Sequence, residues 1–195
     1  MTARLERQIA FLREADKLKT VLRASRLHDD SRFENSAEHS WHIMLYAFVL
    51  AEHAHAQVAI DRVLKMLLLH DLVEIDAGDN PIHGVVDHAA MEREEAAAAQ
   101  RLFGLLPEDQ AAEYRALWEE FEAATTPEAV FAKAVDRVST PLSNLDTGGG
   151  SWQAYDVTFA QLETRVGVPI SRGAPGVWTW LKPRLSAFFG ANGRL

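Results

Sequence analysis

The run from Arg62 to Ile75 is apolar on nearly every face of a helix, so we expect it to be buried. His70, Asp71 and Glu74 nevertheless lie within it. Burying an unpaired ionised carboxylate is very costly, and a buried imidazole needs a partner. On a helix, Glu74 lies four residues after His70 and three after Asp71, so the three side chains can face one point. A bound metal ion would stabilise such a cluster.

Length and composition indicate an ordinary globular domain. The chain has 195 residues, of which 48% are hydrophobic and 25% are charged, and this suits one domain over residues 1–195. The net charge of −8 argues against nucleic acid or an anionic membrane as a partner. An anionic substrate would need local positive charge from arginine, lysine or a metal ion.

The absence of cysteine excludes disulfides and thiolate metal sites and fits a reducing compartment. The first residues carry both charge signs and lead into no signal-type apolar segment. No apolar stretch reaches the roughly 18 to 20 residues that would span a bilayer. We therefore expect a cytoplasmic protein with no membrane partner.

Nearly every segment has helical spacing, and no strand alternation stands out, so the sequence predicts an all-α fold. Asn35, with Glu38 three residues later, predicts a capping box at the start of a helix. Residues 23–34 are polar and show no period, and Pro183 is expected to disturb the last helix. The expected helices span residues 3–22, 36–53, 60–75, 93–101, 107–124, 127–145 and 177–189.

The helix over residues 36–53 is also apolar on most faces. At about 100 degrees per residue, His39 falls in line with Ile43 and Leu50 and should point inward. An inward histidine is commonly a satisfied core residue. A second buried helix that carries a His-Asp pair favours a metal ligand instead.

Two histidine-containing segments stand out, residues 34–41 (ENSAEHSW) and residues 70–79 (HDLVEIDAGD). They resemble the signature stretches of HD-domain metal-dependent phosphohydrolases, in the branch that includes the 5′-deoxynucleotidases. In that family a first histidine, a His-Asp pair and a later aspartate bind one divalent metal ion. The resemblance implies that His39, His70, Asp71 and Asp136 are these ligands. It implies an HD-domain helical bundle with a metal-site core over about 15–145 and C-terminal helices over about 151–190.

The assignment of Asp136 as a metal ligand depends on the resemblance more than on the residues around it. The bulky apolar stripe of its helix includes Val135 and Val138, whereas Asp136 lies nearer Ala129 and Ala132. The pattern alone fits a solvent-exposed aspartate. It also fits a helix whose small alanines allow a close approach to the metal site, and the resemblance selects this second interpretation.

The pattern HD-x-x-E-x-x-x-G-D places Glu74 and Asp79 near the expected metal ion. We expect Glu74 to orient or deprotonate a water, and Asp79 to hold water or protonate a leaving group. The resemblance implies that both take part in catalysis and in recognition of the sugar. Asp79 also lies in a turn-forming sequence, Gly-Asp-Asn-Pro, so a structural role stays open.

Three arginines, Arg23, Arg26 and Arg32, precede the first expected metal ligand and are suited to clamp a phosphate. A solvated basic loop is the alternative for Arg26 and Arg32. The 5′-deoxynucleotidases have an arginine followed by tryptophan in this loop, whereas Arg23 is followed by alanine here. We therefore expect weak discrimination among bases.

Two further features are expected at the surface. His83 and His88 follow Asp71 by 12 and 17 residues, in a loop that contains glycine and proline. Some HD proteins bind a second metal through extra histidines, and some of those are di-iron oxygenases, but a surface loop fits this spacing better. The acidic stretch 119–122 is expected to be a solvated helix face.

The sequence therefore predicts a hydrolase of small-molecule phosphate monoesters, with a deoxynucleoside 5′-monophosphate as the best substrate. Its cofactor would be one divalent ion, and the ligand set suits manganese, cobalt, iron, zinc or magnesium. One alternative is an alarmone hydrolase, which is disfavoured because Ile75 follows Glu74 where that motif has an acid. Others are a di-iron oxygenase and a non-catalytic nucleotide-binding regulator; the presence of Glu74 and Asp79 argues against the regulator.

The oligomeric state follows from the resemblance alone. The family often forms dimers, which implies a homodimer here. Trp152, Trp178 and Trp180 would suit either a dimer interface or the core.

Overall fold

The computed structural model describes residues 2–84 and 87–194, and most of them are helical. Within these residues, no helix combines the length and the apolar content that crossing a membrane requires. Among the described residues, 16–20, 51–53 and 70–73 form 3-10 helices, and 163–167 form a π-helix. The elements in chain order are α1 (Thr2–Ala15), η1 (Asp16–Thr20), β1 (Leu22–Arg26), β2 (Phe33–Asn35), α2 (Ser36–Leu50), η2 (Ala51–His53), α3 (Ile60–Leu69), η3 (His70–Val73), α4 (Glu74–Ala77), α5 (His88–Phe103), α6 (Glu108–Ala123), α7 (Pro127–Asp146), α8 (Ser151–Ala154), α9 (Phe159–Leu162), η4 (Glu163–Gly167), α10 (Val168–Gly173) and α11 (Pro175–Ala191).

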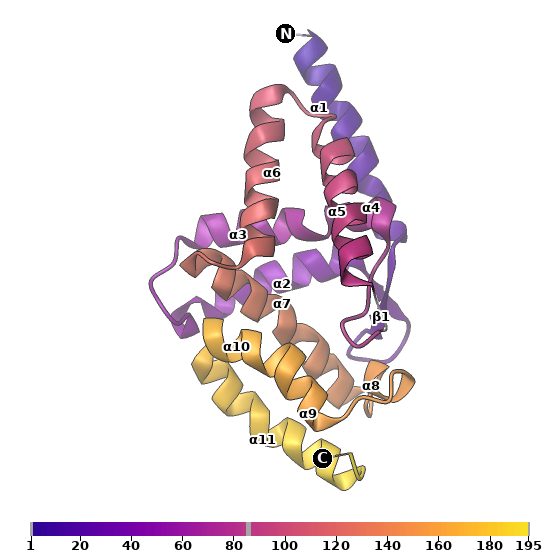
Figure 1. Ribbon diagram of the computed structural model, residues 1–195, viewed down its shortest axis with the longest axis vertical. Coiled ribbons are helices and arrows are strands. Elements are labelled where there is room, and N and C mark those ends of the chain that lie inside the picture. Colours follow the sequence, from indigo (N-terminus) through magenta and orange to yellow (C-terminus); the bar gives the residue numbers. More distant parts are fainter. Residues whose placement is uncertain (1, 85–86, 195) are drawn as a thin grey trace.

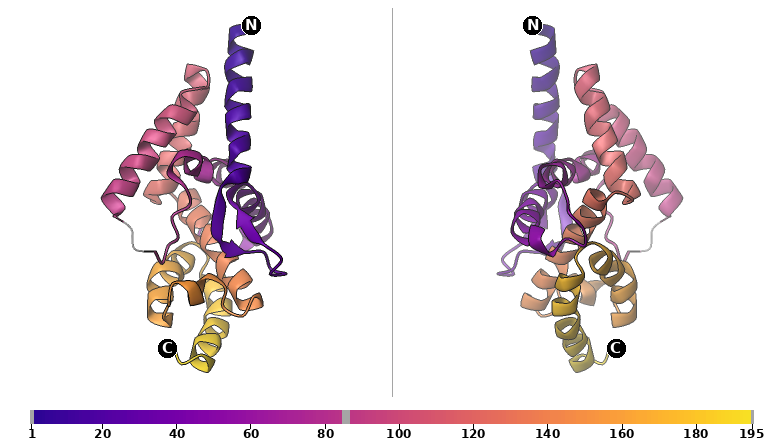
Figure 2. Two further views of the ribbon diagram at one scale, coloured as in Figure 1. Left: turned by 90° about the vertical axis from the view of Figure 1, so that its right-hand side faces the viewer. Right: turned by 90° about the vertical axis from the view of Figure 1, so that its left-hand side faces the viewer.

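The helices form an elongated body with the two termini at opposite ends (Figures 1 and 2). Helices α1, α5 and α6 extend toward the N-terminal end, and α9, α10 and α11 make the C-terminal end. Helix α3 lies in the middle and contacts α2, α6 and α7. Its residues Val63, Met66 and Leu67 are completely buried. The all-α fold predicted from the sequence is confirmed.

The capping box predicted at the start of α2 is confirmed. The Asn35 side chain accepts a hydrogen bond from the Glu38 amide (3.0 Å), and the Glu38 carboxylate accepts one from the Asn35 amide (2.7 Å). This pair fixes where the helix begins and therefore which face it buries. His39, one residue further along, has no exposed surface.

The single helix expected over residues 60–75 is wrong. Helix α3 ends at Leu69, residues 70–73 form the 3-10 helix η3, and α4 follows. At the junction, Nδ1 of His70 donates a hydrogen bond to the carbonyl oxygen of Leu67 (2.8 Å). Apolar periodicity did not reveal the change because all four residues of η3 are buried, as they would be in a continuous helix. The tighter winding of a 3-10 turn redirects the side chains that follow.

The segment expected as an aperiodic loop contains a β-hairpin, which is a second correction. Strand β1 pairs with β2 in antiparallel fashion, with Leu22 opposite Asn35 and Arg26 opposite Phe33. The register between these pairs is irregular. Strands this short carry too few alternating positions to be recognised by period. The hairpin lies beside α7 and α2, so it brings polar side chains to the centre of the molecule.

The C-terminal part also differs in detail from the expectation. Helix α11 continues through Pro183, so the expected disturbance does not break it. Trp152 is a core residue that packs against two phenylalanine rings of α11. Trp178 is partly buried, and Trp180 is half exposed.

Helix α10 approaches α7 very closely because Gly173 has no side chain. A Cβ atom at Gly173 would lie 2.3 Å from the Val130 carbonyl oxygen and 2.5 Å from the Cβ of Ala134. Contacts this short would force the two helices apart if residue 173 carried a side chain. At Gly176, three residues later, the one heavy atom of the described residues within 4 Å of such a Cβ is His53 Nδ1, at 3.7 Å.

We predict that Gly173→Ala lowers the free energy of unfolding by about 1–3 kcal/mol, the usual effect of overpacking a core. The control Gly176→Ala should leave stability unchanged or raise it slightly, because alanine favours a helix more than glycine does. Urea unfolding followed by circular dichroism measures both. Equal stability of the two variants would contradict the close approach.

Candidate metal centre and active-site cavity

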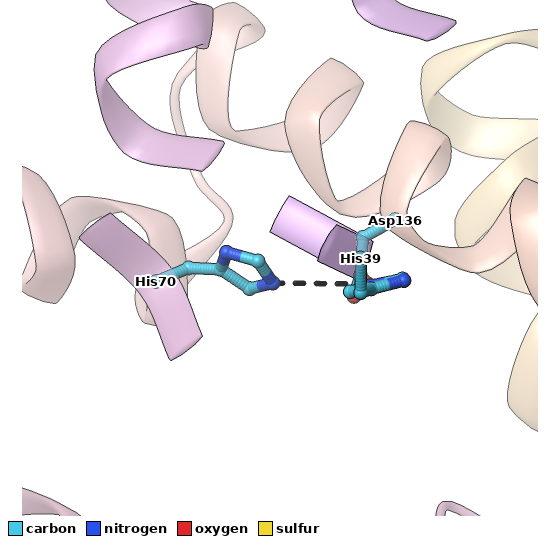
Figure 3. Close-up of side chains that lie close together, drawn as sticks. All are labelled: His39, His70 and Asp136. Carbon is cyan, nitrogen blue, oxygen red and sulfur yellow. Dashed lines mark hydrogen bonds and ion pairs between the residues drawn. The ribbon is translucent and has the colours of Figure 1, made fainter. Parts of the chain in front are cut away.

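Three side chains from three separate helical elements converge in the core. His39 comes from α2, His70 from the start of η3 and Asp136 from the middle of α7. Each offers a ligand atom, and these atoms all lie within 4.8 Å of one another. Asp136 Oδ1 is 3.1 Å from His39 Nε2 and 3.9 Å from His70 Nε2. Figure 3 shows the His70 imidazole pointing toward His39 and Asp136.

The orientation of His70 leaves one ring nitrogen free to bind a cation. Its Nδ1 donates to the Leu67 carbonyl, so in the neutral imidazole Nε2 carries a lone pair. This Nε2 lies only 2.7 Å from Asp71 Oδ1, yet it has no hydrogen-bond partner among the described residues. In that neutral form two electron-rich atoms face each other, an arrangement that becomes favourable when a cation lies beside both.

Other buried polar atoms around this point also lack partners. Within residues 2–84 and 87–194, Asp71 Oδ2 and Glu74 Oε2 are buried and accept no hydrogen bond. Such atoms are costly in a protein interior unless an ion or water satisfies them. The converging ligand atoms belong to His39, His70 and Asp136, and Asp71 lies beside His70 without joining that group. Imidazoles with carboxylates form a donor set that suits a divalent transition metal. The residues present therefore fit the cofactor expected from the sequence.

The carboxylates of the cluster are held ionised despite their burial. Burial would raise the pKa of Asp136, but Arg137, His39 and His70 hold it well below the ordinary value. Burial likewise opposes ionisation of Asp71, and His70 together with nearby Arg23 lowers its pKa. Both side chains are therefore negatively charged at neutral pH, as metal ligands must be.

Glu74 and Asp79 behave differently from these carboxylates. Burial, reinforced by the charge of Asp71, raises the pKa of Glu74 well above its ordinary value. Burial also raises the pKa of Asp79, although Arg23 opposes it and the Ala24 amide donates to its Oδ2 (3.2 Å). Raised carboxyl pKa values in a cavity are typical of groups that transfer protons.

Arg23, delivered by strand β1, lies among three carboxylates. Its Nε is 3.2 Å from Glu34 Oε2, and its Nη1 is 3.6 Å from both Asp71 Oδ2 and Asp79 Oδ1. Only 13% of its side chain is exposed. Arg23 therefore links the hairpin to Asp71 and to Asp79.

These groups open into one cavity of about 190 Å³. The expected site residues that line it are Arg23, His70, Asp71, Glu74, Asp79 and Asp136. His39 lies behind them, completely buried. Arg26 and Arg32 are not among the lining residues: Arg26 pairs with Asp30 and stacks on the Phe33 ring, and Arg32 pairs with Glu38.

The structure places the two loop histidines, His83 and His88, in different surroundings. His88 is exposed at the start of α5, as expected. His83 instead lines the cavity, which corrects the surface interpretation. Burial, together with Arg165 and Arg137, lowers its pKa to about 4, so it is uncharged at neutral pH.

Glu122 of the acidic stretch also lines the cavity, where it pairs with Lys133 (3.0 Å).

Sequence reasoning missed Glu34, Arg137 and Tyr155. Glu34 Oε2 lies 3.3 Å from His39 Nδ1, the side of the ring away from Asp136. Such outer partners orient metal-binding histidines. The position of Glu34 at the start of the first signature segment was the signal available in the sequence. Arg137 and Tyr155 line the cavity, and nothing in their local pattern separates them from surface residues.

Comparison with known proteins shows the family to which the chain belongs. The HD domain family matches residues 15–178, and the chain belongs to that family. A crystal structure of a predicted metal-dependent phosphohydrolase from Magnetospirillum magnetotacticum MS-1 is 48% identical, with a TM-score of 0.91 over 99% of this chain and 98% of that one. A conserved hypothetical protein from Pyrococcus furiosus is 21% identical, with a TM-score of 0.60 over 92% of this chain and 99% of that one, and shares the fold.

Curated relatives match a shorter part of the chain. The 5′-deoxynucleotidase HDDC2 of Homo sapiens is 30% identical over 66% of this chain, and that of Bos taurus is 32% identical over the same share. The match spans 62% of the length of each of these relatives. The 5′-deoxynucleotidase hdd1 of Schizosaccharomyces pombe is 31% identical over 66% of both chains.

We predict that His70→Ala, Asp71→Ala and Asp136→Ala each lower bound metal well below one ion per chain, because each removes a ligand at the buried point of convergence. His88→Ala, which removes an exposed histidine, should keep the wild-type metal content. Plasma emission spectrometry measures the metal, and circular dichroism verifies the helices. Full occupancy in the three ligand variants would overturn the metal assignment.

Proposed function

We propose that this protein is a metal-dependent hydrolase of phosphate monoesters. The observation that carries the proposal is the meeting of His39, His70 and Asp136, with Asp71 beside His70, next to a cavity that Glu74 and Asp79 also line. His39, His70, Asp71 and Asp136 would hold one divalent ion. When bound, such an ion polarises a phosphate oxygen and lowers the pKa of water.

The carboxyl groups around the ligands have distinct roles in this reaction. Glu74 takes the proton of the attacking water while the water oxygen forms a bond to phosphorus. Asp79, whose carboxyl pKa is raised by burial, donates a proton to the ester oxygen as the phosphorus–oxygen bond breaks. Arg23 keeps Asp71 and Asp79 in place through its contacts with both.

We infer that the substrate is a nucleotide, with a deoxynucleoside 5′-monophosphate as the first candidate. The relatives named 5′-deoxynucleotidases support this choice. Aromatic side chains also line the cavity, and Tyr155 among them is 38% exposed. A base can stack on such a ring without a tryptophan after Arg23, and stacking alone discriminates weakly among bases.

We expect Glu74→Gln to keep its metal but to lose roughly two to four decades of turnover, because the amide cannot accept the proton of water. Asp76→Asn is the matched control. Asp76 lies on the same short helix but pairs with Arg101 and does not line the cavity. Phosphate release and metal content are measured on both variants. Wild-type turnover in metal-loaded Glu74→Gln would show that Glu74 is only structural.

The substrate class is tested by phosphate release from deoxy- and ribonucleoside 5′-monophosphates, with manganese or cobalt added. We expect release from the deoxynucleotides and small differences among the four bases. Lack of release from every nucleotide, together with oxygen uptake by an iron-loaded sample, would point to an oxygenase and reject the hydrolase.

A further inference from the structure

Two arginines lie beside the candidate metal ligands. Each contacts one of the carboxylates, on the side away from the histidines. Arg23 Nη1 lies 3.6 Å from Asp71 Oδ2, and Arg137 Nη1 lies 3.6 Å from Asp136 Oδ2. The other oxygen of each carboxylate faces the histidines: Asp71 Oδ1 lies near His70, and Asp136 Oδ1 near His39. Both arginines are among the residues that line the cavity. Each is therefore one carboxylate away from the expected metal position.

The charge of Arg23 is already compensated by the protein. Three carboxylates lie within 3.6 Å of its guanidinium. A phosphate that bound Arg23 would have to share it with all three, and their negative charges would repel the phosphate. The position of Arg23 instead holds Asp71 and Asp79 together.

Arg137 is less occupied and more accessible. Within the described part of the chain, its side chain forms one ion pair, the 3.6 Å contact with Asp136. Its side chain is 30% exposed, compared with 13% for Arg23. A guanidinium can offer two parallel N–H donors to a phosphate. Arg137 can do so while keeping its contact with Asp136.

The other basic side chains that line the cavity do not compete for this role. Lys133 is paired with both carboxylate oxygens of Glu122 (3.0 and 3.1 Å) and lies over the Phe121 ring. His83 is uncharged at neutral pH because of burial and its two arginine neighbours.

We propose that Arg137 binds the phosphate group of the substrate directly, and that Arg23 is a positioning residue for Asp71 and Asp79. This inference rests on the proposed phosphohydrolase function. It assigns the phosphate contact to a residue on α7 in place of the arginines of the hairpin. The phosphate then lies between the metal ligands and the guanidinium that follows Asp136 in the chain.

The test is calorimetric titration of the metal-loaded protein with inorganic phosphate. Arg137→Met should weaken phosphate binding by roughly tenfold or more, the effect of losing charge-assisted hydrogen bonds, with metal content unchanged. Arg137→Lys should recover part of the affinity. Lys133→Met removes a positive charge from the same cavity wall and should leave phosphate affinity within about twofold.

Three results would overturn the inference. One is wild-type phosphate affinity in Arg137→Met, and another is loss of metal from that variant, which would make Arg137 a support for Asp136. The third is absence of phosphate binding by the metal-loaded wild-type protein. Because the titration uses no nucleotide, it stays informative if phosphate release fails with every nucleotide, so the two proposals fail separately.

Discussion

The ionised carboxylates buried in a helical core are the constraint on which the rest of the structure depends. Asp71 and Asp136 lie where unpaired charges would be very costly. Each is flanked by a histidine on one side and an arginine on the other, and these neighbours lower the pKa of both carboxyl groups against the effect of burial. Ligand atoms of His39, His70 and Asp136 lie within 4.8 Å of one another. A divalent cation there would complete the charge balance, and the helices are arranged so that these groups meet.

The same arrangement explains how an acidic chain can accept an anionic substrate. The negative charges in the cavity are divided between those that face the cluster and those, such as Glu122, that are neutralised by their own partner. Positive charge remains available at Arg137 and would be added by the metal. Glu74 and Asp79, whose pKa values are raised by burial, are the groups suited to exchange protons. In the cavity, the ionised aspartates therefore balance positive charge, and the two other carboxyl groups are available for proton transfer.

Much of the fold follows from local signals in the sequence. The capping box at Asn35 fixed the start of α2, the apolar run indicated α3, and the helix expected over residues 127–145 matches α7. Local signals failed where the backbone changes its winding without changing its burial, as at η3, which is buried throughout. They also failed for the hairpin of β1 and β2, because its strands are too short to show alternation. Both misses lie at the site, where side-chain direction matters most.

For the site itself, the sequence determined that His39 and the His70-Asp71 pair face the core, because helix period and an apolar run are local properties. Only the tertiary structure decided that Asp136 joins them and that Arg23, but not the other two hairpin arginines, reaches the cavity. Charge compensation acts through space between residues far apart in the chain. No local pattern can therefore specify which guanidinium will lie beside which buried carboxylate.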